Sequence, residues 1–105
     1  MYQKNIKPNF WVREKTQSSA EVDIVYTYKN KVIPIEIKSG KTGSLKSLHQ
    51  FVERTNHHYA IRIYAGKFNI ENTKTPNGTS YVLMNLPYFL ISQIEKYISY
   101  FIENY

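Results

Sequence analysis

The chain has 105 residues, with 14 Lys and Arg against 8 Asp and Glu, a formal charge of +6 and no cysteine. This length suits one small domain, and the lack of cysteine excludes disulfides and thiolate zinc sites while fitting a reducing cytoplasm. No stretch approaches the roughly 20 apolar residues of a membrane-spanning helix, so no membrane role is expected, and the surplus positive charge favours an anionic partner such as nucleic acid.

The amino-terminal stretch, residues 1–9, is polar and is expected to be an extended lead-in to a domain that covers residues 10–105. The domain begins with FWVRE at residues 10–14, where the side chains alternate with the period of a β-strand. A short polar loop is expected to follow this first strand.

Residues 21–38, EVDIVYTYKNKVIPIEIK, contain two runs rich in β-branched and aromatic residues that meet at Lys29-Asn30. This pattern predicts a β-hairpin rather than a helix. A two-residue loop at that point pairs Tyr28 with Lys31, which sets the register of both strands.

The predicted register sets Asp23 opposite Glu36 and Glu21 opposite Lys38, with all four side chains on one face of the hairpin. A loop with an odd number of residues would instead move the two carboxylates to opposite faces. The other face is predicted to be core and carries Val22, Ile24, Tyr26, Ile33, Ile35 and Ile37.

Two carboxylates opposed in this way repel each other. At a Cβ separation of about 5 Å and an effective dielectric near 20, the cost is about 3 kcal/mol if Asp23 and Glu36 both stay ionised. Lys38, a shared proton, solvent or a divalent cation can offset that cost, and Mg²⁺ takes carboxylate ligands of this kind. A solvated hairpin face with a cross-strand ion pair between Glu21 and Lys38 is the alternative.

The spacing of these charged residues resembles a known signature. Asp23, followed after twelve residues by Glu36-Ile37-Lys38, resembles the D…(D/E)-x-K signature of the PD-(D/E)XK, or restriction-endonuclease-like, superfamily. Over residues 8–87 the chain is also similar to an uncharacterised domain at the carboxyl end of a large family of prokaryotic AAA-type ATPases. The segments that carry this similarity are FWVRE at 10–14, AEVDIV at 20–25, IPIEIKSG at 33–40, and Ser47-Leu48 with Phe51.

The resemblance implies that Asp23 and Glu36 bind Mg²⁺ or Mn²⁺, with the backbone carbonyl of Ile37 as a further ligand. Lys38 then orients or activates the water that hydrolyses a phosphodiester. Glu21 is a further candidate ligand, because it lies on the same predicted face. Active members of the superfamily also have an acidic residue on a helix before the first strand, and nine residues are too few for that helix. Both an active and an inactive site therefore fit the sequence.

The stretch after the hairpin predicts a loop and a helix. Ser44 is a typical N-cap for a helix over residues 45–54, whose apolar residues recur at three- and four-residue spacing. The cationic side chains of Lys41, Lys46 and Arg13 are candidate contacts to nucleic-acid phosphates.

The remaining segments complete the expected fold. His57 and His58 open a strand over residues 59–65 and are expected to be surface or strand-end residues. The strand, helix and strand in succession predict a parallel pair joined by a crossover helix. The segments that follow are expected to be a polar loop over residues 66–78, a strand over 80–86 and a helix from Pro87 to about residue 103.

The sequence therefore predicts a single small α/β domain of the restriction-endonuclease-like type. Its mixed β-sheet contains an antiparallel hairpin, a crossover helix and a C-terminal helix. The expected function is that of an accessory domain of a prokaryotic AAA-family ATPase with a Mg²⁺-dependent nuclease site. The alternative is a non-catalytic module that binds nucleic acid or docks onto protein, and the sequence sets no oligomeric state.

Overall fold

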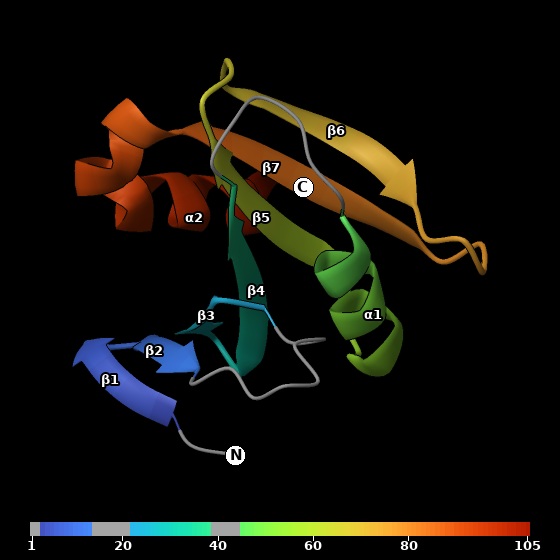
Figure 1. The fold of residues 1–105 in the computed structure, drawn as a ribbon, viewed down its shortest axis with the longest axis horizontal. Helices are drawn as coiled ribbons and strands as arrows, with labels where there is room; N and C mark the ends of the chain where they lie inside the picture. Colours follow the sequence, from blue (N-terminus) through green and yellow to red (C-terminus); the bar gives the residue numbers. More distant parts are fainter. Residues whose placement is uncertain (1–2, 14–21, 39–44) are drawn as a thin grey trace.

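The strands form one mixed seven-stranded sheet, ordered β1-β2-β3-β4-β5-β7-β6, in a computed structural model that describes residues 3–13, 22–38 and 45–105 (Figure 1). Strands β1 to β4 are antiparallel neighbours, β4 is parallel to β5, β5 is parallel to β7, and β6 is antiparallel to β7. The predicted mixed α/β fold is confirmed. The elements are β1 (Gln3–Lys7), β2 (Phe10–Arg13), β3 (Ile24–Tyr28), β4 (Lys31–Ile37), α1 (Lys46–Arg54), β5 (Tyr59–Tyr64), β6 (Asn69–Lys74), β7 (Ser80–Pro87), the 3-10 helix η1 (Tyr88–Gln93) and α2 (Ile94–Asn104).

The β3–β4 hairpin has the predicted two-residue turn. Lys29 and Asn30 both have positive φ, at 46° and 68°, which is the backbone signature of a type I′ turn. Residues pair from Tyr28 with Lys31 at the turn to Ile24 with Ile35 at the other end. The predicted register of the hairpin is therefore confirmed over the whole of β3.

Strand alternation divides the buried side chains into two clusters, one on each face of the sheet. The first lies between the sheet and α2 and includes Ile33, Ile61, Met84, Ile98 and Phe101. The second lies between the sheet and α1 and includes Val25, Leu48, Val52, Ala60 and Leu83. Both faces of the central strands are therefore covered, as is usual where parallel strands are joined through a helix.

Two residues of the predicted core face behave differently from expectation. Val22 is fully buried, but it packs in the cluster beneath α1 together with Val25. Because β3 begins only at Ile24, the alternation of the strand does not reach back to Val22. Ile37 is 42% exposed, since it is the last residue of β4 and lines an open apolar groove with Ile6 and other residues.

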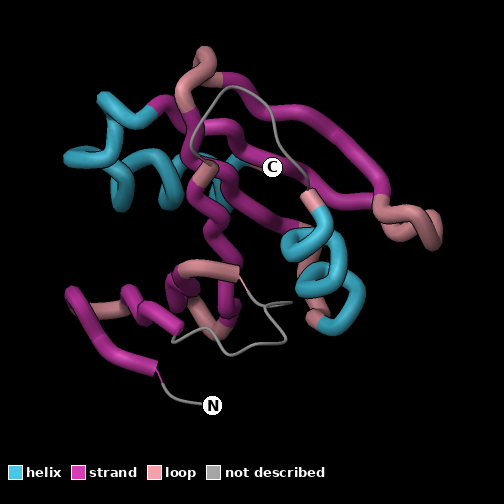
Figure 2. The backbone as a smooth tube through the Cα atoms, viewed as in Figure 1, coloured by secondary structure: helices cyan, strands magenta, loops and turns pink. Residues whose placement is uncertain are grey.

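The predicted polar loop over residues 66–78 is wrong, because it contains β6. This strand pairs with β7 from Asn69 opposite Asn85 to Lys74 opposite Ser80, and Figure 2 shows the two as long neighbouring strands. Its sequence, NIENTK, lacks the alternation of apolar and polar residues by which strands are recognised, and none of its residues is fully buried. The segment forms a strand because its backbone pairs with β7, and its side chains give no sign of that pairing.

Several element ends also differ from the predicted ones. The residues expected as a lead-in contain β1, an edge strand paired with β2, with an irregular register between Asn5 and Lys7. Helix α1 begins at Lys46 with Leu45 in the N-cap position, and the proposed cap Ser44 lies outside the described residues. The single helix predicted from Pro87 is a 3-10 helix followed by α2.

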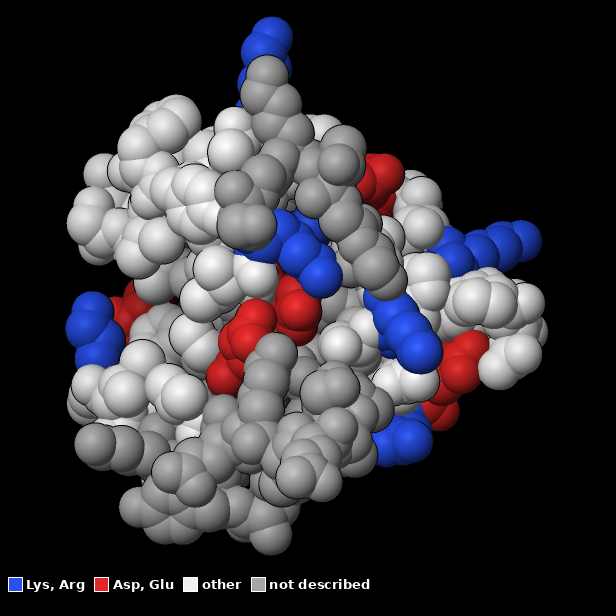
Figure 3. All heavy atoms as spheres, in the orientation of Figure 1, with Lys and Arg blue, Asp and Glu red and all other residues white. Residues whose placement is uncertain are grey.

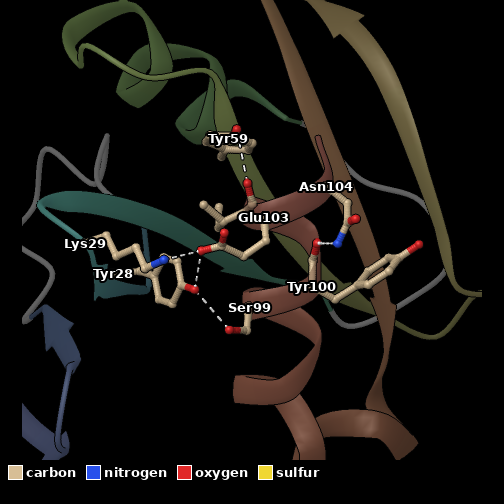
Figure 4. Close-up of polar contacts among 8 residues, drawn as sticks. Tyr28, Lys29, Tyr59, Ser99, Tyr100, Glu103 and Asn104 are labelled. Carbon is tan, nitrogen blue, oxygen red and sulfur yellow. Dashed lines mark hydrogen bonds and ion pairs between the residues drawn. The ribbon is translucent and has the colours of Figure 1, made fainter.

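Polar contacts join the hairpin turn to α2 (Figure 4). The Tyr28 hydroxyl lies 3.0 Å from the Ser99 hydroxyl and donates a 2.8 Å hydrogen bond to Glu103. Glu103 also forms a 2.6 Å ion pair with Lys29, the first turn residue. Exposed ion pairs contribute little free energy, so these contacts mainly orient the helix end against the turn.

In the segments that the structure describes, we find no helix with the length and apolarity needed to cross a bilayer.

Candidate functional site

Asp23 lies directly before β3, and the last paired residues of the hairpin are its neighbour Ile24 and Ile35, the residue that precedes Glu36 on β4. Its carboxylate oxygen Oδ2 accepts a 3.0 Å hydrogen bond from the backbone N–H of Ile37. This contact crosses from one strand to the other at the residue next to Glu36. It fixes the Asp23 carboxylate beside the end of β4.

Glu36 is a buried carboxylate, with only 6% of its surface exposed, and its Oε1 atom is withdrawn from solvent. Its Oε2 atom lies 3.4 Å from the Lys38 ammonium. Because strand residues two apart share a face, both side chains project toward the α1 side of the sheet. An ionised carboxylate in such a place needs compensating charge, and Lys38 supplies part of it.

Of the other predicted site residues, the structure describes Ile37 and Lys46, only the backbone of Arg13, and neither Glu21 nor Lys41. Ile37 ends β4, with its N–H bonded to Asp23. Lys46 is the exposed first residue of α1 and lines a cavity of about 390 Å³ along that helix. Arg13 ends β2, but its side chain is outside what the structure describes. Glu21 and Lys41 lie outside the described residues.

A row of polar side chains continues from Glu36 across the sheet. Glu36 is the register partner of Arg62 on β5, Arg62 is the partner of Asn85 on β7, and Asn85 is the partner of Asn69 on β6. Partners in register share a face of the sheet, so these side chains follow one line on the α1 side. We call Asp23, Glu36, Lys38, Arg62, Glu71, Asn69 and Asn85 the polar row.

Hydrogen bonds connect the far half of the polar row. Arg62 Nε donates a 2.8 Å bond to Asn85 Oδ1, and Asn85 Nδ2 donates bonds of 2.7 Å to Asn69 and 2.6 Å to Glu71. Asn85 has no exposed surface, and the Arg62 guanidinium lies 4.8 Å from the ring centre of Tyr64. A buried amide with both its oxygen and its nitrogen bonded is a rigid support for a neighbouring side chain.

Arg62 and Asn85 are not among the site residues predicted from the sequence. The available signal is one polar residue in each of two otherwise apolar strands, YAIRIY and SYVLMNLP. Only the register between those strands brings the two side chains into line with Glu36. In Figure 3, acidic and basic side chains meet near the middle of the face in view, over β4 and β5.

The donor set of the polar row suits a hard cation. Asp23, directly before β3, and Glu36, on β4, offer carboxylate oxygens at the same end of the hairpin. Across the described ranges, no three or more His, Cys, Asp or Glu side chains gather into a metal-binding group. Mg²⁺ is commonly held by one or two carboxylates together with water and substrate phosphate, so two carboxylates and a carbonyl fit it. Structural zinc sites, in contrast, are built from cysteine and histidine ligands.

The comparisons with known proteins give one match. No curated protein and no solved structure matches the chain. The model of one protein family matches residues 1–89, which include the whole sheet and α1. The chain therefore belongs to the family described as "Domain of unknown function (DUF4143)".

Proposed function

We propose that this chain is an accessory domain of a prokaryotic AAA-family ATPase and that it carries a Mg²⁺-dependent nuclease site of the PD-(D/E)XK type. The observation that supports the site is the 3.0 Å bond that holds the Asp23 carboxylate at the Ile37 N–H, next to Glu36 in the chain, with Lys38 3.4 Å from Glu36. The order of elements is also compatible, because three antiparallel strands are followed by a helix and by a strand parallel to the third. A chain without cysteine fits the cytoplasm, where we propose that the domain acts.

The proposed ligands are Asp23, Glu36 and the Ile37 carbonyl, with Glu21 as a further candidate. A strand residue directs its N–H and C=O to the same side, and the Ile37 N–H faces Asp23, so its carbonyl is expected on that side too. A divalent cation, when bound, supplies polarisation of a phosphate oxygen and makes water more acidic. Lys38 places a positive charge where negative charge builds up during attack on the phosphorus.

We expect weak turnover. Strand β1, which directly precedes the first predicted strand, has the sequence QKNIK and contributes no acidic residue to the site. The proposal therefore separates metal binding, which needs Asp23 and Glu36, from cleavage, which needs further groups. The ATPase module is the proposed partner that presents the substrate.

A titration with Mg²⁺ or Mn²⁺, followed by NMR at Asp23, Glu36 and Lys38, tests the metal site. Asp23→Asn is expected to weaken metal binding about tenfold or more, because it removes one ligand charge, while the apo stability stays level or rises as the repulsion with Glu36 is relieved. Lys38→Ala is expected to keep metal binding and to abolish any nicking of plasmid or single-stranded substrate.

Glu103→Gln is the matched control, since it removes a carboxylate on α2, at the Lys29 contact, and is expected to leave metal binding unchanged. A wild-type domain with no saturable response to millimolar Mg²⁺ or Mn²⁺ would contradict the proposed site.

The second candidate function is a non-catalytic docking module. The observation that favours it is an apolar groove of about 200 Å³ between β1, β4 and the η1–α2 segment. Ile6, Ile37 and Ile91 line it and are 52%, 42% and 43% exposed. If the metal titration fails while Ile91→Asp abolishes a stable complex with the ATPase module, the docking function is the better explanation.

A further inference from the structure

We propose that Arg62 binds a phosphate group beside the metal site, that Asn85 positions Arg62, and that Arg62 binds the phosphate more tightly when a divalent cation occupies Asp23 and Glu36. The inference rests on the proposed metal site and adds an anion-binding residue to it. The ligand is a phosphate group of a nucleic-acid strand or of a free phosphate compound, which share the same chemistry.

Arg62 lies on the strand next to the candidate ligand. In the parallel pairing of β4 and β5, Glu36 and Arg62 are register partners, and both project to the α1 side. Lys38 lies on the same side of Glu36's own strand, 3.4 Å from its carboxylate. Glu36 therefore has the Lys38 ammonium beside it along its own strand, and Arg62 is its register partner on the neighbouring strand.

The Arg62 guanidinium is held in one orientation. Its Nε donates to Asn85 Oδ1 at 2.8 Å, and its central carbon Cζ lies over the ring of Tyr64, 4.8 Å from the ring centre. Among the described residues, Nε is the guanidinium nitrogen of Arg62 that makes a hydrogen bond. The two terminal nitrogens form a planar fork that matches two oxygens of a phosphate.

The other hydrogen bonds of Asn85 fix the orientation of its side-chain amide. Its Nδ2 is used by Asn69 and Glu71, so its Oδ1 must face Arg62, and the amide has no exposed surface through which to turn. A side chain held by a buried, fully bonded neighbour loses little conformational freedom when a ligand arrives.

A divalent cation at the proposed metal site would strengthen anion binding at Arg62. Glu36 and Arg62 are register partners on adjacent strands, so a cation held by Asp23 and Glu36 would add two positive charges beside the strand that carries Arg62. A phosphate bound by Arg62 could then place an oxygen on the cation as well. Metal and phosphate should therefore increase each other's affinity, because such coupling is reciprocal.

The experiment measures binding of a short fluorescein-labelled DNA duplex and single strand by anisotropy, with Mg²⁺ replacing Na⁺ at constant ionic strength. For a site that lacks metal coupling, Mg²⁺ competes with the protein for phosphates and weakens binding. The wild-type domain is expected to bind about tenfold more tightly with Mg²⁺, as one charge-assisted contact permits. Arg62→Gln is expected to lose this gain while binding Mg²⁺ alone as tightly as the wild type or more tightly, because a cation beside the ligands is gone.

Lys96→Gln is the matched control, since it removes one positive charge from α2 on the opposite face of the sheet and should keep the gain with Mg²⁺. Arg62→Lys keeps the charge without the fork and should recover only part of the gain. It also serves if Arg62→Gln does not fold, and full recovery in Arg62→Lys would overturn the positioning role of Asn85. Inorganic phosphate is the competing probe: displacement of the DNA at low phosphate concentration identifies free phosphate compounds as ligands, and its failure identifies the nucleic-acid backbone.

The inference is overturned if Arg62→Gln keeps the gain or if Lys96→Gln loses it to the same extent. Mg²⁺ binding by the wild type without any gain in DNA or phosphate affinity overturns this inference alone. A wild-type domain that binds no Mg²⁺ overturns the proposed function as well.

Discussion

His57 shows how one side chain can replace a missing part of a β-ladder. Its Nδ1 accepts a 3.1 Å hydrogen bond from the Tyr59 N–H, so the ring proton is on Nε2, which donates a 2.7 Å bond to the Val32 carbonyl. The ladder between β4 and β5 begins only at Ile35, and Pro34 just before it has no N–H to donate. The imidazole therefore satisfies a carbonyl that the neighbouring strand does not reach. His57 lies just before β5, at the strand end that the sequence predicts, but it is buried there and not on the surface.

This arrangement predicts a pH response of stability. Burial lowers the pKa of His57 below its ordinary value of 6.5, and the bond to Val32 opposes that shift only in part. Because the unfolded chain then binds the proton more readily, the contribution is fully present above pH 6.5 and is lost as the pH falls from there toward the folded pKa. Urea denaturation between pH 7.5 and 5 measures it.

His57→Gln is expected to be less stable at neutral pH by about 1–3 kcal/mol, since a buried carbonyl or amide loses its partner, and to show a flatter pH dependence. The adjacent exposed residue provides the control, as His58→Gln should keep the wild-type response. An equal pH dependence in His57→Gln and the wild type would mean that His57 is not the responsible group.

At the scale of the element, a strand or helix can be predicted from the sequence when the residues that determine it lie close together in the chain. The β3–β4 hairpin can be predicted because its turn, its alternation and its register are all local. Strand β6 cannot be predicted in the same way, because its order comes from backbone bonds to β7 rather than from its own apolar residues. The same reason applies to the site. Asp23, Glu36 and Lys38 belong to one hairpin, whereas Arg62 and Asn85 join them only through strand pairing between distant segments.

The hairpin turn gives an element-scale prediction. Asn30 occupies a left-handed conformation at φ 68°, which asparagine and glycine tolerate and a β-branched residue does not. Asn30→Val should lower the free energy of unfolding by about 1–2 kcal/mol, while Asn30→Gly should stay within about 0.5 kcal/mol of the wild type. Denaturant titrations of the three proteins measure the difference. Equal stability of the valine and glycine variants would show that the turn relaxes to another type.

At the scale of the molecule, the sheet is stabilised from both faces. The family match ends at residue 89, inside η1, so α2 lies beyond the matched region although it covers one face of the sheet. Phe101 of α2 is fully buried and packs edge-on against Tyr59 of β5, with ring centres 5.4 Å apart. Stability of the matched region in this chain should therefore depend on the helix that follows it.

Adjacent residues on α2 test this dependence. Phe101→Ala should cost about 3–5 kcal/mol, a large share of the roughly 5–15 kcal/mol of a typical domain. Tyr100→Ala, at a position 51% exposed, should cost less than about 1 kcal/mol. Thermal and denaturant unfolding compare the two. Similar losses for both variants would mean that α2 is held by its surface contacts rather than by its buried face.

The irregular register of β1 should hinder edge-to-edge association between copies of the molecule. In the described part of the chain, β1 and β6 form the two edges of an open sheet, and a straight edge can template the addition of further strands and lead to fibrils. The shift between Asn5 and Lys7, followed by Pro8 and by Asn9 at φ 74°, bends the outer backbone of β1 and interrupts its row of donors. At the other edge, the charged side chains of Glu71 and Lys74 on β6 disfavour pairing with a strand of another molecule. The sheet can therefore have two open edges without forming fibrils.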